Sequence, residues 1–372
     1  MLKIGITGQA GFVGKHLYNV LGLYPSEFER VGFDRSYFAD GGKMDEFVRQ
    51  CNVIVHLAGV NRHSDPRCIY DTNVALAENL VASLDRCGSK AHVIYSSSTQ
   101  EERDNPYGRS KLAGRKMLAD WAARAGGKFT GMIIPNVFGP FGHPYYNSVI
   151  ATFCHQLSHN ETPVIEADGE LKLIYVGELA GKMLECIQNG QAADQLLVPH
   201  THQARVSEIL ALLKTYRDEY QERGIIPALR NDFELNLFNT YRCYMDIGRH
   251  YPVSFRLHTD MRGSFVEVVR LNTGGQVSFS TTLPGITRGN HFHTRKIERF
   301  AVIRGKALIQ LRQVGTGNVM NFNVSGDQPS YIDMPVWHTH NITNTGEEEL
   351  FTIFWINECF DPEDPDTYME VV

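Results

Sequence analysis

The sequence predicts two domains of different fold class: a doubly wound parallel α/β domain over residues 1–249 and an all-β barrel over residues 250–372. Three observations support this division. A chain of 372 residues is long for one domain. Short apolar runs alternate with helix-length amphipathic segments up to about residue 200, as in repeated β-α units. From Phe255 onward, short alternating strands are separated by Gly, Pro and Asn turns, and no helical period remains.

Five buried parallel strands are predicted in the first domain, each bounded by Gly, Pro or Ser. They are residues 2–7 (LKIGIT), 30–33 (RVGF), 53–59 (VIVHLAG), 92–98 (HVIYSSS) and 130–135 (TGMIIP). Helices are predicted between them at 13–22, 73–88 and 108–126. Residues 206–245 also have a helical pattern and are predicted to continue this domain.

The second domain is predicted to consist of short strands only. They are "SFVEVVRL", "GQVSFSTTL", "ERFAVIRG", "KALIQLRQV", "MNFNVSG", "SYIDMP" and "LFTIFWI". The boundary between the domains is predicted within "IGRHYPVS", residues 247–254, where Pro252 interrupts the helical pattern.

Composition excludes several classes of protein. A net charge of -6 and a sequence pI near 6.2 provide no basic surface for nucleic acid or an anionic membrane. No apolar run reaches the roughly 18 residues of a membrane span, and the chain begins directly in a predicted strand, so we expect neither membrane insertion nor a signal peptide. Seven cysteines without a CxxC pair indicate reduced thiols and a cytoplasmic protein.

A glycine-rich turn follows the first predicted strand and precedes the first predicted helix. Gly8, Gly11 and Gly14 form GxxGxxG, which lets the backbone approach a pyrophosphate at the helix N-terminus. Asp34 lies twenty residues past Gly14, where an acidic side chain commonly binds the ribose hydroxyls. These features predict a nicotinamide dinucleotide site.

The residues leave the choice between NAD and NADP open. Asp34 alone favours NAD, because a 2′-phosphate would meet a carboxylate. Arg35 and Lys15 could instead accommodate that phosphate. The predicted cofactor contacts are Gly8, Gly11, Phe12, Val13, Gly14, Asp34, Arg35, Leu57, Ala58, Tyr107 and Lys111.

The segment "NPYGRSKLAG" places Tyr107 and Lys111 four residues apart, on one face of a helix. A phenol whose pKa is lowered by a neighbouring ammonium can exchange a proton with a sugar oxygen near pH 7. The segment "YSSSTQ" ends a predicted strand and offers Ser97 or Ser98 as a hydrogen-bonding partner. These residues predict a proton-transfer site beside the nicotinamide.

Together, the glycines, "HLAG", "YSSSTQ" and "NPYGRSKLAG" resemble the extended short-chain dehydrogenase/reductase family over about residues 1–245. The resemblance implies Tyr107 as catalytic acid/base, Lys111 as its electrostatic partner and nicotinamide-ribose contact, and Ser98 as the substrate-orienting hydroxyl. It also implies a nucleotide-sugar substrate. The substrate contacts that it implies are Ser97, Asn136 and Asn147.

One departure from that family limits the reaction. Sugar 4,6-dehydratases of the family carry an Asp-Glu pair just after the catalytic hydroxyl residue, where this sequence has Thr99 and Gln100. We therefore expect reduction or oxidation of a sugar and not dehydration.

A second set of chemical residues lies in "GITRGNHFHTRKIERFAVIRG", residues 285–305. His291 and His293 are two apart and therefore point to the same side of a strand. With Glu298 and with His340 from "PVWHTHNITN", they provide three nitrogens and one oxygen for a divalent metal. The alternative interpretation is a set of polar core residues without a metal.

The spacing from Gly285 to Gly305 fits the first motif of the cupin superfamily, which the chain resembles over about residues 255–360. In the second motif Trp337 stands at the place of the usual glycine, and Gly326 lies farther upstream than expected. The resemblance implies a jelly-roll barrel. We expect a metal at the four residues and choose zinc, although spacing alone does not identify the ion.

The whole chain resembles the bifunctional reductases of UDP-N-acetyl-L-fucosamine synthesis, the CapF/WbjC type, in bacterial capsule and O-antigen pathways. The resemblance is carried by "ITGQAGFVGK", "VIVHLAGVNR", "SSSTQEERDNPYGRSKL", "YYNSVIATF", "GITRGNHFHTRKIERF", "HNITN" and "FDPEDPDTY". It implies that the cupin domain epimerises C3 of a UDP-2-acetamido-2,6-dideoxy-4-hexulose through a metal-stabilised enolate. It also implies that the first domain then reduces C4 to a UDP-2-acetamido-2,6-dideoxy-L-talose, with NADPH because that family uses it.

Other interpretations remain at this stage. The barrel could be a structural or dimerisation module beside a one-step reductase, the chain could be a regulatory sugar-binding protein, or the substrate could be another 4-ketohexose nucleotide. Candidate bases for epimerisation are His338, Lys296 and Glu298. Because cupins often pair through exposed strands, we also expect a homodimer.

Overall fold

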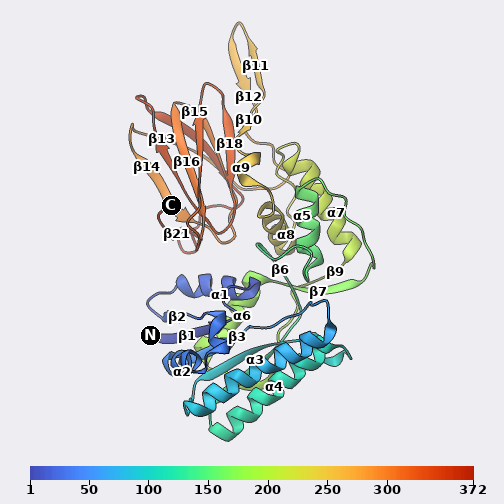
Figure 1. Cartoon of the computed structure of the whole chain (residues 1–372). Helices are drawn as coiled ribbons and strands as arrows, with labels where there is room; N and C mark the ends of the chain where they lie inside the picture. The colour runs from blue at the N-terminus through green and yellow to red at the C-terminus, as the bar shows by residue number, and fades with distance from the viewer. The chain divides into compact units, whose positions relative to one another are not determined.

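The computed structural model describes all 372 residues, and the chain divides into two compact units. Unit 1 contains Met1–Thr152 and Asp168–Val206, and unit 2 contains Phe153–Ala167 and Ser207–Val372. The units are described separately below (Figure 1). None of the helices combines the length and the apolar character that a membrane crossing requires.

Unit 1 is built on a parallel sheet with the strand order β2-β1-β3-β4-β5-β8. The strands are β1 (Leu2–Thr7), β2 (Phe28–Val31), β3 (Val53–His56), β4 (His92–Ser98), β5 (Lys128–Ile134) and β8 (Ala193–Leu197). The connections are α1 (Phe12–Gly22), η1 (Arg35–Ala39), α2 (Gly41–Gln50), α3 (Pro66–Arg86), η2 (Thr99–Glu102), α4 (Pro106–Ala125) and α6 (Val176–Asn189). The order reverses between β1 and β3, and ligands of such sheets bind where the order reverses, beyond the carboxyl ends of the strands.

Helices cover both faces of this sheet (Figure 1). On one face, Leu17 of α1 and Met183 of α6 pack with Ile6 of β1. On the other, Leu84 of α3 and Trp121 of α4 pack with strand residues of the same sheet. The strands read as continuous apolar runs because both of their faces are buried. A smaller sheet in unit 1 joins β6 (Asn136–Phe138), β7 (Glu170–Tyr175) and β9 (His202–Arg205).

The chain passes from unit 1 to unit 2 within α5 (Val149–Ser158) and again near Val206. Unit 2 then begins with a helical layer, which comprises α7 (Val206–Tyr216), the π-helical turn η3 (Arg217–Gln221), α8 (Asp232–Arg242) and α9 (Ile247–His250).

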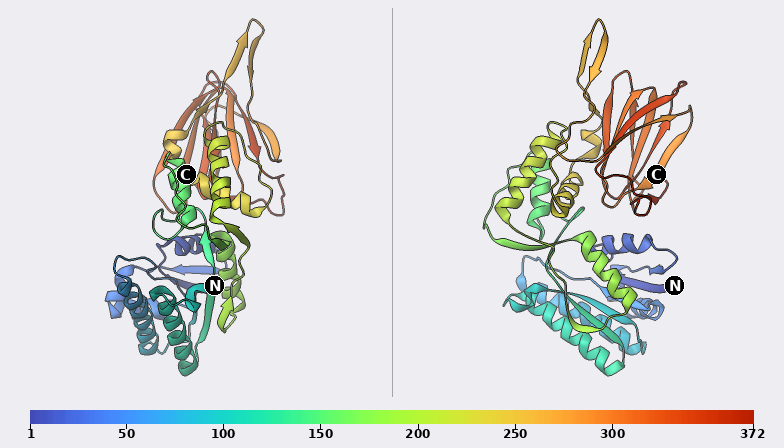
Figure 2. Two further views of the ribbon diagram at one scale, coloured as in Figure 1. Left: turned by 90° about the vertical axis from the view of Figure 1, so that its right-hand side faces the viewer. Right: turned by 180° about the vertical axis from the view of Figure 1, so that it is seen from behind.

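Two five-stranded antiparallel sheets form the barrel of unit 2, seen from two further directions in Figure 2. One sheet has the order β10-β18-β15-β20-β13 and the other β17-β16-β19-β14-β21. The strands of the first are β10 (Val253–Ser254), β13 (Gln276–Thr282), β15 (Glu298–Arg304), β18 (Ser330–Met334) and β20 (Leu350–Ile356). Those of the second are β14 (Thr287–Phe292), β16 (Lys306–Gln313), β17 (Val319–Ser325), β19 (His338–Asn344) and β21 (Tyr368–Met369). A separate exposed hairpin consists of β11 (Leu257–Asp260) and β12 (Gly263–Val266).

Buried polar contacts attach the helical layer to the barrel. Tyr220 donates to Asp333 at 2.7 Å, and Arg242 donates to the main-chain oxygen of Met334 at 2.9 Å. Arg299 of β15 makes a bidentate ion pair with the same Asp333 carboxylate at 2.8 and 2.9 Å. Buried charges require hydrogen-bonding or oppositely charged partners. Here the partners come from the barrel and from helical residues after 206, so these two parts pack together.

The predicted fold class is confirmed: a doubly wound parallel α/β sheet is followed by an all-β barrel. The compact units differ from the predicted boundary at 249/250, because residues 207–249 pack in unit 2. Compact packing does not define where one activity ends, so the functional boundary stays a prediction.

Candidate active site and metal centre

A cavity of about 750 Å³ in unit 1 lies at the carboxyl ends of β1, β3 and β4. It brings together most of the residues predicted for the dinucleotide and the sugar. The predicted residues that line it are Gly8, Gly11, Phe12, Val13, Gly14, Arg35, Leu57, Ser97, Ser98, Tyr107, Lys111, Asn136 and Asn147.

The glycine-rich turn leaves no room for side chains. Gly8 has a φ of +77°, and a Cβ there would lie 2.7 Å from the main-chain nitrogen of Ala58. A Cβ on Gly14 would lie 2.3 Å from the carbonyl oxygen of Gly8. Helix α1 begins at Phe12, and its N-cap Gly11 provides no side-chain cap. The first N–H groups of α1 are therefore available to an anion, as a pyrophosphate site requires.

The two residues predicted to choose the cofactor are placed differently. Arg35 lines the cavity, whereas Asp34 is outside its lining. The Asp34 carboxylate accepts from the main-chain N–H of Ser36 at 2.8 Å and from its hydroxyl at 2.5 Å. These hydrogen bonds lower the pKa of Asp34. Ala58, another predicted contact, is also outside the lining, although its main chain lies close to Gly8.

Tyr107 and Lys111 both face the cavity from the first turns of α4. The Lys111 ammonium lies 5.8 Å from the centre of the Tyr107 ring and donates to the main-chain oxygen of Ser96 at 2.9 Å. Burial lowers the pKa of Lys111 to about 8, against the opposing effect of Glu101. Asn105 caps α4 through the N–H of Gly108, which fixes the start of the helix.

The predicted lowering of the Tyr107 pKa is not found in the structure. Burial, together with the neighbouring Tyr146, raises the pKa of Tyr107 to about 12. Desolvation, the largest cause of the shift, disfavours the phenolate. Tyr107 is therefore a protonated group, suited to donating a proton.

The serines at the end of β4 differ in their contacts. Ser98 is buried and accepts from the N–H of Gln100 at 3.2 Å. The Ser97 hydroxyl donates to the carboxylate of Glu101. That carboxylate forms a buried ion pair with Arg115 at 2.8 Å. Three residues near the site were not predicted from the sequence: Ser96, Glu101 and Tyr146. None of them has a position fixed by a motif. They do lie within or next to the segments "YSSSTQ" and "YYNSVIATF", which were used for the resemblance.

The four predicted metal ligands meet inside the barrel. His291 is near the end of β14, His293 follows it directly, Glu298 begins β15 and His340 lies on β19. Their ligand atoms all lie within 4.8 Å of one another. A β-bulge between Gly289 and His291 directs the histidine inward, since the pairing with β19 shifts there.

Three donor atoms of the cluster lie close together in the barrel and lack hydrogen-bond partners. The Nε2 atoms of His293 and His340 each lie 3.1 Å from Oε2 of Glu298. None of these three buried atoms has a hydrogen-bond partner of suitable geometry. The Nδ1 atoms face main-chain oxygens instead: Asp366 at 2.5 Å for His293 and His338 at 3.2 Å for His340. With the protons on Nδ1, both Nε2 atoms carry lone pairs beside the Glu298 carboxylate, so the residues fit a divalent cation.

Electrostatics agree with this fit at His291 and Glu298, whereas at His293 the effect of burial is outweighed by Glu298, which raises the pKa of that imidazole. Burial, with the neighbouring imidazoles, lowers the pKa of His291 to about 4 and so keeps it neutral. Burial opposes the charge of Glu298, but His293 and His340 hold its pKa well below the ordinary value. Neutral imidazole and ionised carboxylate are the forms that bind a metal.

Two other residues singled out in the sequence lie beside the cluster. His338 is buried on β19, two residues before His340, and its Nδ1 lies 3.0 Å from the main-chain oxygen of Val336. Trp337, at the place of a usual glycine, has a φ of +59° and stacks on Phe292. The left-handed conformation that favours glycine is thus kept by a buried tryptophan.

Known protein families match both parts of the chain. The family described as "NAD dependent epimerase/dehydratase family" matches residues 4–198, and "Polysaccharide biosynthesis C-terminal domain" matches residues 258–368.

Similar proteins extend over the whole length. The chain is 33% identical to UDP-2-acetamido-2,6-beta-L-arabino-hexul-4-ose reductase of Pseudomonas aeruginosa strain PA103, covering 99% of this chain and 98% of that protein. It is 34% identical to the crystal structure of the capsular polysaccharide assembling protein CapF from Staphylococcus aureus, with 100% of both chains covered and a TM-score of 0.64. RMD from P. aeruginosa, solved with NADPH, is 21% identical with a TM-score of 0.53; it covers 59% of this chain and 83% of its own, and shows a shared fold alone.

The end-to-end likeness in sequence and fold, together with the matched family, places the chain in the NAD-dependent epimerase/dehydratase family as a CapF-like epimerase/reductase with a short-chain dehydrogenase/reductase domain and a C-terminal polysaccharide-synthesis domain.

Proposed function

We propose that the barrel epimerises C3 of a UDP-2-acetamido-2,6-dideoxy-4-hexulose and that unit 1 reduces the C4 ketone with NADPH. The product is a UDP-2-acetamido-2,6-dideoxy-L-talose on the route to UDP-N-acetyl-L-fucosamine for capsule or O-antigen. One observation carries the proposal: a relative named as the reductase of a UDP-linked 4-ketosugar matches this chain from end to end.

In the reductase step, NADPH supplies a hydride to C4 when bound. Tyr107 donates its phenolic proton to the C4 oxygen, which suits a group whose pKa is raised to about 12. Ser98 donates a hydrogen bond to the same oxygen from the end of β4. The Lys111 ammonium stabilises the phenolate that forms after proton transfer. The absence of an acidic pair at Thr99 and Gln100 supports reduction without loss of water.

Two features support NADPH over NADH. Arg35 lines the cavity with its guanidinium available, while the Asp34 carboxylate is already bonded to Ser36. A guanidinium binds a 2′-phosphate in a bidentate manner, and a carboxylate would repel it.

The barrel step relies on His291, His293, Glu298 and His340, which would hold a divalent ion, proposed to be zinc. Such an ion supplies Lewis-acid stabilisation of negative charge developing on the C4 oxygen. Epimerisation requires a base that removes the C3 proton from one face and a solvent-derived proton delivered to the opposite face. We assign the role of the base to His338.

The other two candidate bases are engaged elsewhere. Glu298 belongs to the ligand set. Lys296 is buried, donates to the main-chain oxygen of Pro365 at 2.7 Å and lies 3.6 Å from Glu358. These contacts occupy the Lys296 ammonium, so we do not assign it as the base.

We further propose a cytoplasmic homodimer. All seven cysteines are unpaired, which supports a reducing compartment. Light scattering of the purified protein tests the dimer, and a monomeric mass would contradict it.

The proposed function is tested by incubating the protein with the UDP-4-ketohexose in deuterated water without nicotinamide. We expect deuterium at C3, read by proton NMR and mass spectrometry. Subsequent addition of NADPH is expected to consume the ketone, and NADH is compared in parallel.

The controls are two histidine variants. His291→Ala should lose the deuterium exchange, whereas His258→Ala, which changes an exposed histidine of the separate hairpin, should retain it. NADPH consumption without any exchange in the unaltered protein would instead make the barrel structural and leave a one-step reductase.

A further inference from the structure

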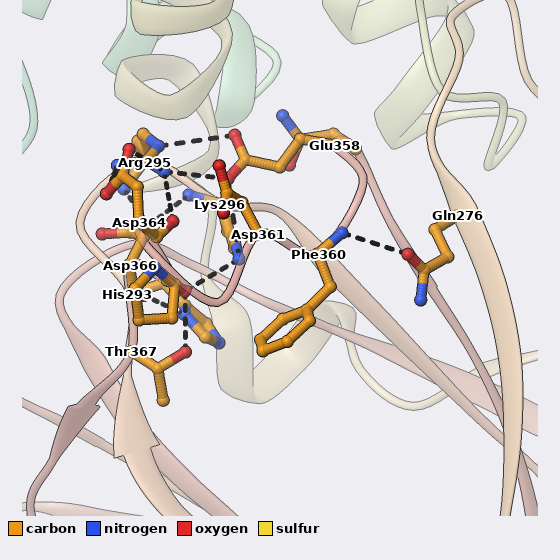
Figure 3. A network of polar contacts seen from close by, with 12 residues as sticks. Gln276, His293, Arg295, Lys296, Glu358, Phe360, Asp361, Asp364, Asp366 and Thr367 are labelled. Atoms are coloured by element: carbon orange, nitrogen blue, oxygen red, sulfur yellow. Dashed lines mark hydrogen bonds and ion pairs between the residues drawn. The ribbon is translucent and has the colours of Figure 1, made fainter.

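A segment near the C-terminus contacts His293 of the metal-ligand cluster (Figure 3). We call residues 358–367 the C-terminal strap. It has no helix or strand of its own and leads into β21, which pairs with β14 beside His291. A segment without a backbone ladder is ordered only by its individual contacts, so those contacts show what the strap holds.

Asp366 of the strap contacts both His293 of the cluster and the turn that follows it. Its main-chain oxygen faces Nδ1 of His293 at 2.5 Å. Its carboxylate accepts from the main-chain N–H groups of Thr294, Arg295 and Lys296 at 2.9 to 3.2 Å, and from the Thr294 hydroxyl at 2.7 Å.

The three N–H groups belong to the turn between two predicted metal ligands, His293 and Glu298. The turn lies between β14 and β15, outside both sheets, and the Asp366 carboxylate accepts from three of its N–H groups. Asp366 is only 3% exposed and has a φ of +41°, a conformation that Asp and Asn tolerate better than other non-glycine residues. The carboxylate thus fixes the path by which the chain passes from one ligand to the next.

Neighbouring residues hold the strap in place from both sides. Arg295 donates to Glu358 at 3.1 Å and to Asp364 at 3.0 Å. Lys296 donates to the main-chain oxygen of Pro365, and the N–H of Phe360 donates to Gln276 at 3.0 Å. Figure 3 shows these contacts converging on the strap.

We propose that Asp366 is a positioning residue for the metal centre. Its main-chain oxygen keeps the proton of His293 on Nδ1, so that Nε2 presents a lone pair to the ion. Its carboxylate fixes the 294–296 turn and with it the separation of His293 from Glu298. Hydrogen-bond partners of this kind set the orientation and the tautomer of ligating histidines, and their loss typically costs about 10 to 100-fold in metal affinity. The inference rests on the proposed metal site.

The test measures zinc affinity of the full-length protein by competition with a chromophoric chelator, after removal of bound metal by dialysis. Asp366→Asn keeps the left-handed backbone accessible but replaces one acceptor oxygen by an NH₂ group that opposes the N–H donors. We expect zinc to bind about 10 to 100-fold more weakly. Asp361→Asn is the matched control: it makes the same change of charge in the same strap, at an exposed side chain that accepts from the nearby N–H of Glu363, and should leave the affinity unchanged within about twofold.

The melting temperature distinguishes a positioning role from a structural one. A purely structural Asp366 would lower the melting temperature of the metal-free protein and leave its zinc affinity unchanged, which would overturn the proposal. A positioning role instead reduces the zinc-induced gain in melting temperature, because that gain follows the affinity.

A second variant keeps the test valid if Asp366→Asn does not fold. Thr294→Val removes only the hydroxyl contact to the carboxylate, and zinc affinity equal to that of the unaltered protein would overturn the proposal. If the unaltered protein itself binds no zinc, the metal arm of the proposed function fails together with this inference. Equal binding by the unaltered protein and by Asp366→Asn refutes the inference alone.

Discussion

The two candidate sites are built over different distances along the chain. The cavity of unit 1 depends on short segments: three glycines within seven positions, and a tyrosine and a lysine one helical turn apart. The barrel cluster combines residues of two sheets, and Nδ1 of His293 donates to the main-chain oxygen of Asp366, 73 positions away. A site made of local segments is set by backbone conformation, whereas the barrel site is set by long-range packing.

The sites also differ in how burial acts on charge. In unit 1 burial moves Tyr107 and Lys111 toward their neutral forms. In the barrel, the neighbouring imidazoles outweigh burial and keep Glu298 ionised. The first arrangement favours proton transfer and the second favours binding a cation. A change confined to one site should therefore leave the activity or ligand affinity of the other site unchanged.

The largest expected effect is on reduction in Tyr107→Phe. Without the phenolic proton the rate of NADPH oxidation should fall by about 10² to 10⁴-fold. Deuterium exchange at C3 should continue, because no residue of the barrel cluster is altered. Both are measured on one preparation, with Tyr70→Phe on the exposed part of α3 as control. Loss of exchange in Tyr107→Phe would break the separation of the two sites.

The sequence predicts buried strands more accurately than exposed ones. Strand β1 covers the predicted residues 2–7, because a buried parallel strand is a continuous apolar run and Gly8 ends it. The strand predicted at 264–271 ends instead at Val266, in an isolated hairpin with β11, which was not predicted. Both strands are largely exposed, and an exposed strand has no buried face that would give an alternating apolar pattern.

The candidate sites show the same limits. All four barrel ligands come together, because motif spacing encodes which residues face inward. The Asp366 contact has no sequence signal, because nothing in "FDPEDPDTY" indicates which distant turn its carboxylate accepts from. Likewise, the raised pKa of Tyr107 reflects how deeply the phenol is buried, which spacing relative to Lys111 does not report.

A smaller effect is expected from Gly14→Ala. The added Cβ would lie 2.3 Å from the carbonyl oxygen of Gly8, which is main chain and cannot rotate away. Overpacking of this kind costs about 1–3 kcal/mol, so we expect weaker NADPH binding by about 5 to 150-fold, measured by fluorescence titration.

Gly32→Ala is the matched control for that variant, because a Cβ there meets nothing within 4 Å. Zinc affinity should be the same in both variants. Unchanged NADPH binding in Gly14→Ala would contradict the assignment of the turn to the pyrophosphate.

The smallest expected effect is a pH dependence of reduction set by Lys111. Burial lowers its pKa to about 8 from an ordinary value of 10.5, so the ammonium is present below pH 8 and is lost above it. The rate of reduction should be level below that pH and fall about tenfold per unit above it. Stability changes in the opposite direction: the unfolded chain binds the additional proton between pH 8 and 10.5, so this group's contribution to the free energy of unfolding rises there. A falling rate is therefore not explained by unfolding.

The control for this prediction is Lys111→Arg, which keeps its charge and should remove the decline in rate. Deuterium exchange at C3, measured at the same pH values, serves as the internal reference. A decline that persists in Lys111→Arg would assign it to another group.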